Sequence, residues 1–173
     1  ISESGEEMLT TVNIILSCGS SSASFPGLAP DGDAVLDSTG VLNLPEVPES
    51  LIIVGAGAIG LELGDFFGMM GSKITIVEAA PHIAPTEDAD IAKEMDRVQS
   101  KAGRTCITGV MAKSLVTKDG QAELTLGDGR VLTASKALVA VGRTPNTAGL
   151  DCEKAGCTLK RRGFVDVNDR SEE

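Results

Sequence analysis

Residues 51–60 read Leu51-Ile52-Ile53-Val54-Gly55-Ala56-Gly57-Ala58-Ile59-Gly60, a short apolar run followed by a cluster of glycines. Four consecutive apolar residues are typical of a parallel strand that is buried on both faces. The glycines end this strand, and from Ile59 onward the apolar residues recur with helical spacing up to a break near Gly71. The predicted buried face of this helix consists of Ile59, Leu63, Phe66, Phe67 and Met70. The stretch therefore predicts a strand, a tight turn and a helix.

The glycine spacing G-x-G-x-x-G at this turn predicts a site for a dinucleotide. Gly55 permits the tight turn, Gly57 lets the backbone approach the pyrophosphate, and Gly60 lets helix and strand pack closely. The unpaired N–H groups of the first helical turn and the positive end of the helix dipole favour the anionic diphosphate. A glycine turn needed only for packing is the alternative, and the strand before it and the helix after it favour the dinucleotide. The residues predicted to contact the cofactor here are Gly55, Gly57, Ala58, Ile59 and Gly60.

Glu78 is the candidate that selects the kind of dinucleotide. It follows a second buried-type strand at residues 74–77 and lies 23 residues after Gly55. A carboxylate at this place accepts hydrogen bonds from the adenosine ribose hydroxyls and repels a 2′-phosphate. Residues 79–92 contain no Lys or Arg that would bind such a phosphate, so NAD is favoured over NADP. The alternative is a solvated acid at the end of a strand.

The rest of the chain predicts short elements joined by turns. Asp119-Gly120 and Asp128-Gly129 are hairpin signals and indicate an antiparallel meander. The expected elements are a β-prone run at residues 12–16, a turn-rich connection at 26–50, a helix from a cap at Thr86 to about Lys101, strands at 104–108 and 136–141, and meander strands at 114–117, 122–126 and 131–133. The predicted fold class is α/β, a Rossmann-like parallel sheet with helices and a three-stranded antiparallel meander.

Composition excludes several classes of protein. The chain has 173 residues, 42% of them hydrophobic, which is enough for one main domain. A net charge of -10 and an aromatic content of 2% argue against nucleic-acid binding, because there is neither a basic patch nor a stacking platform. No apolar run is long enough for a membrane span, and the residues after Ile1 do not form a signal peptide. We expect an excised piece of a soluble, cytoplasmic protein.

The cysteines and the single histidine do not predict a redox or metal site. Cys152 and Cys157 are spaced C-x4-C, but they do not follow a glycine-rich turn and no histidine lies nearby to act as base. The segment that begins at Cys152 instead indicates a short surface helix ending at Gly156. His82 lies between a proline and an isoleucine without a companion ligand, so it is interpreted as a surface residue and no metal is expected.

Beyond these motifs, the chain resembles the NAD-binding domain of the pyridine nucleotide-disulfide oxidoreductases, most closely that of the dihydrolipoamide dehydrogenases. The resemblance runs from about residue 12 to residue 170. It is carried by the stretches Pro45 to Gly64, Phe25-Pro26-Gly27, Leu36 to Gly40, Ser72 to Glu78, Ala140 to Thr147 and Gly163 to Val167. It implies a division into residues 1–22 as a remnant of a preceding FAD-domain segment, 23–148 as the NAD-binding domain, and 149–173 as the start of the return to the FAD domain.

The resemblance also assigns roles to single residues. Glu62, which complements the helix dipole in any case, matches the glutamate near the nicotinamide and the flavin. Ala58 lies where some relatives carry a gating aromatic residue. Val110 resembles the residue beside the adenine, and Gly142 matches the loop glycine near the nicotinamide half. At residues 17–20 the chain has Ser-Cys-Gly-Ser where the family usually has Ala-Thr-Gly-Ser.

The parent enzyme implied by the resemblance is a homodimeric flavoprotein and a component of a 2-oxoacid dehydrogenase complex. It reoxidises dihydrolipoamide through a disulfide and FAD and passes hydride to NAD+. The flavin fingerprint, the redox disulfide and the C-terminal interface domain of the family are missing here. The chain is therefore expected to bind NAD(H), to carry no catalytic residue, and not to turn over alone.

Two other readings of the sequence stay open. An NADH-dependent oxidase or a coenzyme A-disulfide reductase would share the glycine motif and Glu78. A non-catalytic NAD-binding module is the alternative outside the enzymes. An upstream flavin fingerprint with a cysteine pair would favour the enzyme, whereas a natural start near Ile1 would favour the module.

Overall fold

The apolar run before the glycine turn is strand β3 (Ser50–Val54), the middle strand of a parallel five-stranded sheet with the order β2-β9-β3-β4-β5. Leu51 of β3 lies opposite Ile74 of β4 and Lys136 of β9. A separate antiparallel sheet has the order β6-β7-β8. The predicted fold class, a Rossmann-like parallel sheet with helices and a three-stranded meander, is confirmed.

The computed structural model describes residues 8–172, which divide into two units. Residues 22–143 form the sheet unit, and residues 8–21 with 144–172 form the terminal unit. The elements of the sheet unit, besides β3, are β2 (Val35–Leu36), α1 (Ser38–Leu42), α2 (Ala58–Met69), β4 (Lys73–Val77), α3 (Ala89–Lys101), β5 (Thr105–Ile107), β6 (Ala112–Lys118), β7 (Gln121–Leu126), β8 (Val131–Ala134) and β9 (Lys136–Val139). The sheet unit contains the predicted dinucleotide turn.

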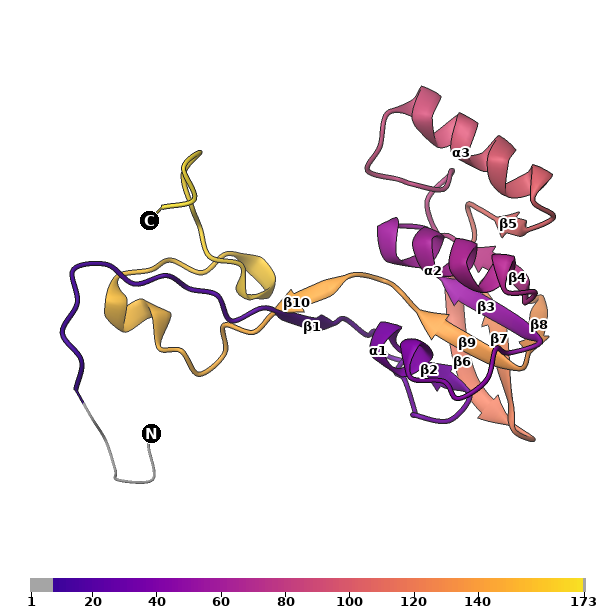
Figure 1. Ribbon diagram of the computed structural model, residues 1–173, viewed down its shortest axis with the longest axis horizontal. Helices are drawn as coiled ribbons and strands as arrows, with labels where there is room; N and C mark the ends of the chain where they lie inside the picture. Colours follow the sequence, from indigo (N-terminus) through magenta and orange to yellow (C-terminus); the bar gives the residue numbers. More distant parts are fainter. Residues whose placement is uncertain (1–7, 173) are drawn as a thin grey trace. The chain divides into compact units, whose positions relative to one another are not determined.

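Alternate residues of β3 face opposite sides of the parallel sheet and give the sheet unit three layers (Figure 1). Leu51 and Ile53 pack in a core with Phe67 of α2. Ile52 packs in a second core with Leu124 of the meander. Because both faces of the sheet are covered, the central strand β3 is apolar and buried from Leu51 to Val54 rather than alternating.

Helix α2 begins and ends as predicted, but its predicted buried face is partly wrong. Phe66 and Met70 are 47% and 55% exposed, and Ile59 and Leu63 are only partly buried. The residues that the helix buries are Gly60, Leu61, Gly64 and Phe67. A Cβ added at Gly64 would lie 2.9 Å from Cδ1 of Ile53, so the helix approaches the sheet closely at its glycines, with Leu61 and Phe67 packing beside them.

Three other expectations about the elements are corrected. Residues 12–16 form no strand, and Val12 and Ile15 are 96% and 90% exposed, because a strand needs a hydrogen-bonding neighbour as well as β-prone residues. The N-cap of α3 is Asp88 rather than Thr86. The connection at residues 26–50 contains strand β2 and helix α1, which were not predicted.

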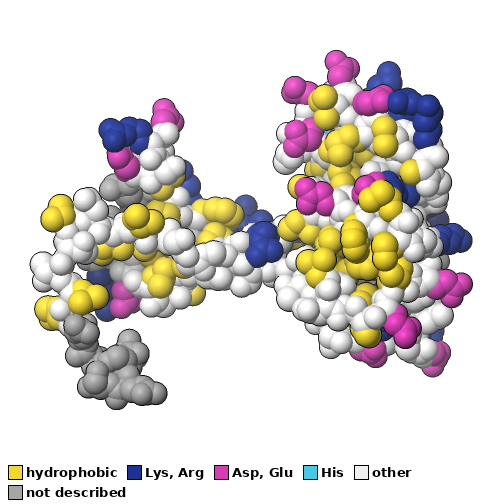
Figure 2. Space-filling view, in the orientation of Figure 1, with side chains coloured by type: hydrophobic (Ala, Val, Ile, Leu, Met, Phe, Trp, Pro, Cys, Tyr) yellow, Lys and Arg dark blue, Asp and Glu magenta, His cyan; other side chains and the backbone are white. Residues whose placement is uncertain are grey.

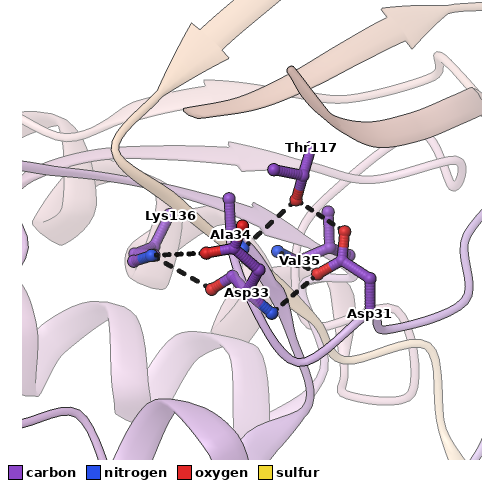
Figure 3. A network of polar contacts seen from close by, with 6 residues as sticks. All are labelled: Asp31, Asp33, Ala34, Val35, Thr117 and Lys136. Atoms are coloured by element: carbon purple, nitrogen blue, oxygen red, sulfur yellow. Dashed lines mark hydrogen bonds and ion pairs between the residues drawn. The ribbon is translucent and has the colours of Figure 1, made fainter. Parts of the chain in front are cut away.

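A network of polar contacts joins the loop before β2 to its neighbouring strand β9 and to β6 of the meander (Figure 3). The Asp31 carboxylate accepts a hydrogen bond from the Thr117 hydroxyl of β6 at 2.5 Å, and that hydroxyl accepts one from the Ala34 N–H at 3.2 Å. Lys136 of β9 donates to the Asp33 carbonyl at 3.0 Å. A strand of two residues is thus held by side chains as well as by its own ladder.

The terminal unit is built from short elements. Strands β1 (Ser20–Ser22) and β10 (Arg143–Pro145) pair with each other, and the 3-10 helices η1 (Cys152–Ala155) and η2 (Arg161–Gly163) follow. The short helix predicted at Cys152 is η1, with Gly156 as its C-cap. The predicted division at residues 22 and 148 stays a prediction, and its residues 1–7 and 173 lie outside the described residues.

Candidate nucleotide-binding cleft

A cleft of about 400 Å³ opens at the carboxyl ends of β3, β4 and β9. The residues that line it are Phe25, Leu28, Val54, Gly55, Gly57, Val77, Glu78, Ala79, Pro85, Met111, Ala112, Ala140, Val141 and Gly142. The chain leaves β3 for α2 and returns as β4 on one side, whereas β9 lies on the other side of β3. In open α/β sheets, ligands bind at such a switch point.

The three glycines of the turn meet different surroundings in the structure. Gly55 has a φ of +104°, and a Cβ there would lie 2.4 Å from the Ala140 carbonyl oxygen. A Cβ at Gly60 would lie 2.0 Å from the Gly55 carbonyl oxygen. A Cβ at Gly57 would meet no atom within 4 Å. The fold itself requires Gly55 and Gly60, whereas Gly57 leaves open space in front of the helix.

The N-terminus of α2 faces that space with backbone donors. Gly57 is the N-cap and offers no side chain to the helix. The N–H of Leu61 donates to the Gly57 carbonyl at 3.0 Å, so the N–H groups of Ala58, Ile59 and Gly60 precede this helical bond. Such N–H groups, together with the helix dipole, make a site for an anion such as a diphosphate.

Glu78 lies between the glycine turn and the loop that follows β4. Its Oε2 accepts a hydrogen bond from the Ala56 N–H and its Oε1 accepts one from the Ala80 N–H, both at 2.8 Å. An ionised carboxylate offers about four acceptor positions, so two are left for a ligand. Among the described residues that line the cleft, Glu78 is the charged one, and none is Lys or Arg.

The structure brings together most of the predicted cofactor-binding residues, but not all. Gly55, Gly57, Glu78 and Gly142 line the cleft, and Ala58, Ile59 and Gly60 form the first turn of α2 beside it. These residues meet although residues 55 and 142 are far apart in the sequence. Their contact with a cofactor stays a prediction.

Of the two remaining predicted residues, Val110 lies beside the cleft and Glu62 lies away from it. The Val110 N–H donates to the Glu78 carbonyl at 3.2 Å, next to the cleft. Glu62 lies on the exposed side of α2 and lines a second hollow between α2 and α3, with Phe66 and Met95. Phe66 and Met69 at this hollow are 47% and 73% exposed, and Figure 2 shows hydrophobic side chains gathered on one face of the sheet unit. The structure therefore does not bring Glu62 into the cleft that Glu78 lines.

The apolar wall of the cleft was not predicted as part of the site. Phe25, Leu28, Pro85 and Met111 come from three loops. The loop at residues 25–28 is held beside β6 by a hydrogen bond from the Leu115 N–H to the Gly27 carbonyl at 2.8 Å. No local sequence signal points to this pairing, because it depends on the tertiary arrangement of the two sheets.

Other kinds of site are not found in the described part of the chain. No group of three His, Cys, Asp or Glu residues is arranged to hold a metal ion there. None of the helices described is long and apolar enough to cross a bilayer. None of the cysteines among the described residues forms a disulfide. Burial raises the pKa of Cys106, as does the charge of Asp96.

A glycine turn, a helix N-terminus and an acidic residue at the switch point of a parallel sheet define the class of dinucleotide-binding folds. Within that class the chain belongs to the pyridine nucleotide-disulphide oxidoreductase family, whose model matches residues 2–173. It is 38% identical over 173 residues to dihydrolipoyl dehydrogenase 1, mitochondrial, of Arabidopsis thaliana. The match covers 97% of this chain and 34% of that protein.

The solved structures that are similar to the chain include the following two. LpdA of Mycobacterium tuberculosis has a TM-score of 0.79 and 32% identity, with 87% of this chain and 33% of that one covered. The HOCl-induced flavoprotein disulfide reductase RclA of Escherichia coli has a TM-score of 0.78 and 34% identity, with 90% and 36% covered. The chain thus spans about a third of the length of the relatives that it matches.

Proposed function

We propose that this chain is the NAD(H)-binding domain of a flavin-dependent dihydrolipoamide dehydrogenase. The parent reaction converts dihydrolipoamide and NAD+ into lipoamide, NADH and H+. One observation carries the proposal: the open space at Gly57 lies between the N-terminus of α2 and the cleft that the Glu78 carboxylate lines. This arrangement has a donor set for a diphosphate and an acceptor for ribose hydroxyls, and it fits a dinucleotide.

The residues of the chain bind and orient the cofactor in this proposal. The N–H groups of Ala58, Ile59 and Gly60 donate to the diphosphate, and the two remaining acceptor positions of Glu78 take the ribose hydroxyls. Because Glu78 brings a negative charge and no Lys or Arg lines the cleft, a 2′-phosphate is repelled. The bound dinucleotide supplies the hydride acceptor, and no residue of this chain takes part in the chemistry.

The parent enzyme supplies what the chain does not carry. FAD, the redox disulfide and the interface domain belong to its other regions, so the chain alone does not turn over. We propose a homodimer within a 2-oxoacid dehydrogenase complex, in line with the relatives named dihydrolipoyl dehydrogenase. A cytoplasmic location stays a prediction, and several of these relatives are named mitochondrial.

A reductase for another disulfide is the alternative that a specific observation favours. The chain is 34% identical to the flavoprotein disulfide reductase RclA. It is 38% and 35% identical to two relatives named dihydrolipoyl dehydrogenase, so identity gives little separation between the two functions. The parent protein would be assayed with dihydrolipoamide and NAD+, and separately with NADH and coenzyme A disulfide. Turnover of dihydrolipoamide supports the proposal, and turnover of the disulfide alone contradicts it.

Calorimetric titration of the 173-residue chain with NADH and with NADPH tests the binding function. We expect NADH to bind at least about tenfold more tightly, because an unpaired phosphate charge beside a carboxylate costs more than 1.4 kcal/mol, the equivalent of one factor of ten. Equal or tighter binding of NADPH would contradict the role of Glu78. Absence of heat with either nucleotide, checked by fluorescence of NADH, would contradict the proposed function.

A further inference from the structure

The glycine turn is held in place by the loop that follows β4. Ala56, in the middle of the turn, is fully buried. Its N–H donates to Oε2 of Glu78 at 2.8 Å, and its carbonyl accepts a hydrogen bond from the Ala84 N–H at 2.9 Å. Both backbone groups of Ala56 are therefore satisfied by residues of this loop, at the place where the chain passes from β3 to α2.

Glu78 is itself fixed on both sides. Its N–H donates to the Ile107 carbonyl at 2.8 Å, and its own carbonyl accepts from the Val110 N–H at 3.2 Å. Its Oε1 holds the Ala80 N–H at 2.8 Å. The backbone of Glu78 is thus bound to β5 and to Val110, and its carboxylate is bound to the loop at Ala80. These bonds fix the position from which the carboxylate reaches the glycine turn.

The second contact of the loop with the turn comes from a strained residue. Ala84 has a φ of +49°, in the left-handed region that disfavours an L-amino acid with a side chain. Ala84 is also buried, at 4% exposure. A strained backbone of this kind persists only where the surrounding structure requires it, and here it presents the N–H that binds the Ala56 carbonyl.

From these contacts we infer that Glu78 is a positioning residue for the glycine turn, in addition to the ribose contact of the proposed function on which this inference rests. By holding the Ala56 N–H, the carboxylate keeps the turn in the shape that opens the N-terminus of α2 to the diphosphate. Glu78 therefore contributes to binding of a part of the dinucleotide that it does not touch. A residue that only accepts ribose hydroxyls would make no such contribution.

The variant Glu78→Gln separates the two roles. Glutamine has the same shape and still hydrogen-bonds ribose hydroxyls, but its amide NH2 cannot accept from a backbone N–H, so one of the two bonds to Ala56 and Ala80 is lost. Glu49→Gln is the matched control, because Glu49 is exposed and precedes β3 at the opposite end of the strand from the cleft. If Glu78→Gln fails to fold, Glu78→Asp, whose shorter side chain cannot reach both N–H groups, replaces it.

Two measurements on the full chain test the inference. Amide hydrogen exchange by NMR without ligand should be at least about tenfold faster at Ala56 or Ala80 in Glu78→Gln, with no change in Glu49→Gln. Binding of an NADH analogue whose adenosine ribose lacks both hydroxyls should be about five- to tenfold weaker in Glu78→Gln than in the unchanged chain.

Equal exchange rates, or equal affinities for the analogue, would overturn the positioning role. If the unchanged chain does not bind NADH at all, the proposed function is overturned instead. The claim that Glu78 contributes to binding of the diphosphate is then overturned with it. The exchange rates would still decide whether Glu78 holds the turn.

Discussion

Gly57 is the glycine of the turn that the fold does not require but that leaves space for a ligand. Its φ of -77° is open to any residue, and a Cβ there meets no atom within 4 Å. We predict that Gly57→Ala changes the free energy of unfolding by less than about 1 kcal/mol, because a poorer N-cap is offset by a less flexible unfolded chain. NADH affinity should fall by at least about tenfold, since the methyl group occupies the space of the diphosphate. Urea unfolding and calorimetry measure the two effects.

Gly60→Ala is the control for that experiment, because its Cβ would lie 2.0 Å from the Gly55 carbonyl oxygen. We expect it to destabilise the protein by about 1–3 kcal/mol through overpacking. If Gly57→Ala binds NADH as tightly as the unchanged chain, the space in front of α2 is not the diphosphate site.

At the scale of single residues, the sequence predicts the motif but not which contacts each of its residues makes. The spacing of Gly55, Gly57 and Gly60 identifies the turn, and Glu78 follows at the expected distance. That Glu78 binds the Ala56 N–H becomes visible only once the two loops are placed side by side. Likewise, Glu62 was predicted from a resemblance, and its exposed position on α2 follows from how the helix packs.

At the scale of elements, Arg104, the residue before β5, joins helices α2 and α3. Its guanidinium pairs with Asp65 of α2 at 2.7 Å and donates to Gln99 of α3 at 2.8 Å. The Arg104 side chain is 6% exposed and that of Asp65 is 48% exposed. We predict that Arg104→Ala lowers the free energy of unfolding by about 2–3 kcal/mol, less than a fully buried pair would give because water reaches Asp65.

Arg97→Ala is the matched variant, because Arg97 pairs with Glu94 on the exposed side of α3. Solvent screens an exposed pair, which contributes little to stability, so this variant should unfold at nearly the same urea concentration as the unchanged chain. Equal effects of the two substitutions would contradict the assigned role of Arg104.

The loop before β2 gives the sheet unit an acid-sensitive contact (Figure 3). Burial raises the pKa of Asp31, but hydrogen bonds from Thr117, Asp33 and Val35 outweigh this and lower the pKa from its ordinary value of 3.8. A lowered folded-state pKa gives stability that is present above the unfolded value and is lost as pH falls through the folded value. We predict that Asp31→Asn lowers the free energy of unfolding at pH 7. The difference in this free energy between the variant and the unchanged chain should shrink below about pH 4. A difference that is constant between pH 7 and pH 3, measured by urea unfolding, would exclude this contribution.

The sequence predicts those elements whose signal is local. Strand β3, helix α2 and the meander hairpins follow from apolar runs, helical spacing and Asp-Gly turns. Strand β2 has only two residues, and it exists because Val35 lies opposite Ala137, about a hundred residues later in the chain. The buried face of α2 was predicted correctly only at Phe67, since the glycines through which the helix approaches the sheet carry no hydrophobic signal.

At the scale of the whole molecule, the chain corresponds to about a third of its relatives. The fold class could be predicted from the order of elements alone, because a strand-helix-strand unit and a meander leave few arrangements of layers. Residues 12–16 could not be predicted in this way. Their apolar side chains suggest a strand, but in the terminal unit Val12 and Ile15 are exposed.

The central claim is that NADH binds with its diphosphate at the N-terminus of α2. An NMR titration of the isotope-labelled chain with NADH tests this most directly, residue by residue. We predict saturable shifts of the backbone amides of Ala58, Ile59 and Gly60, with no shift at the meander turns Gly120 and Gly129. Shifts confined to the hollow between α2 and α3, or no shift at the start of α2, would contradict the account.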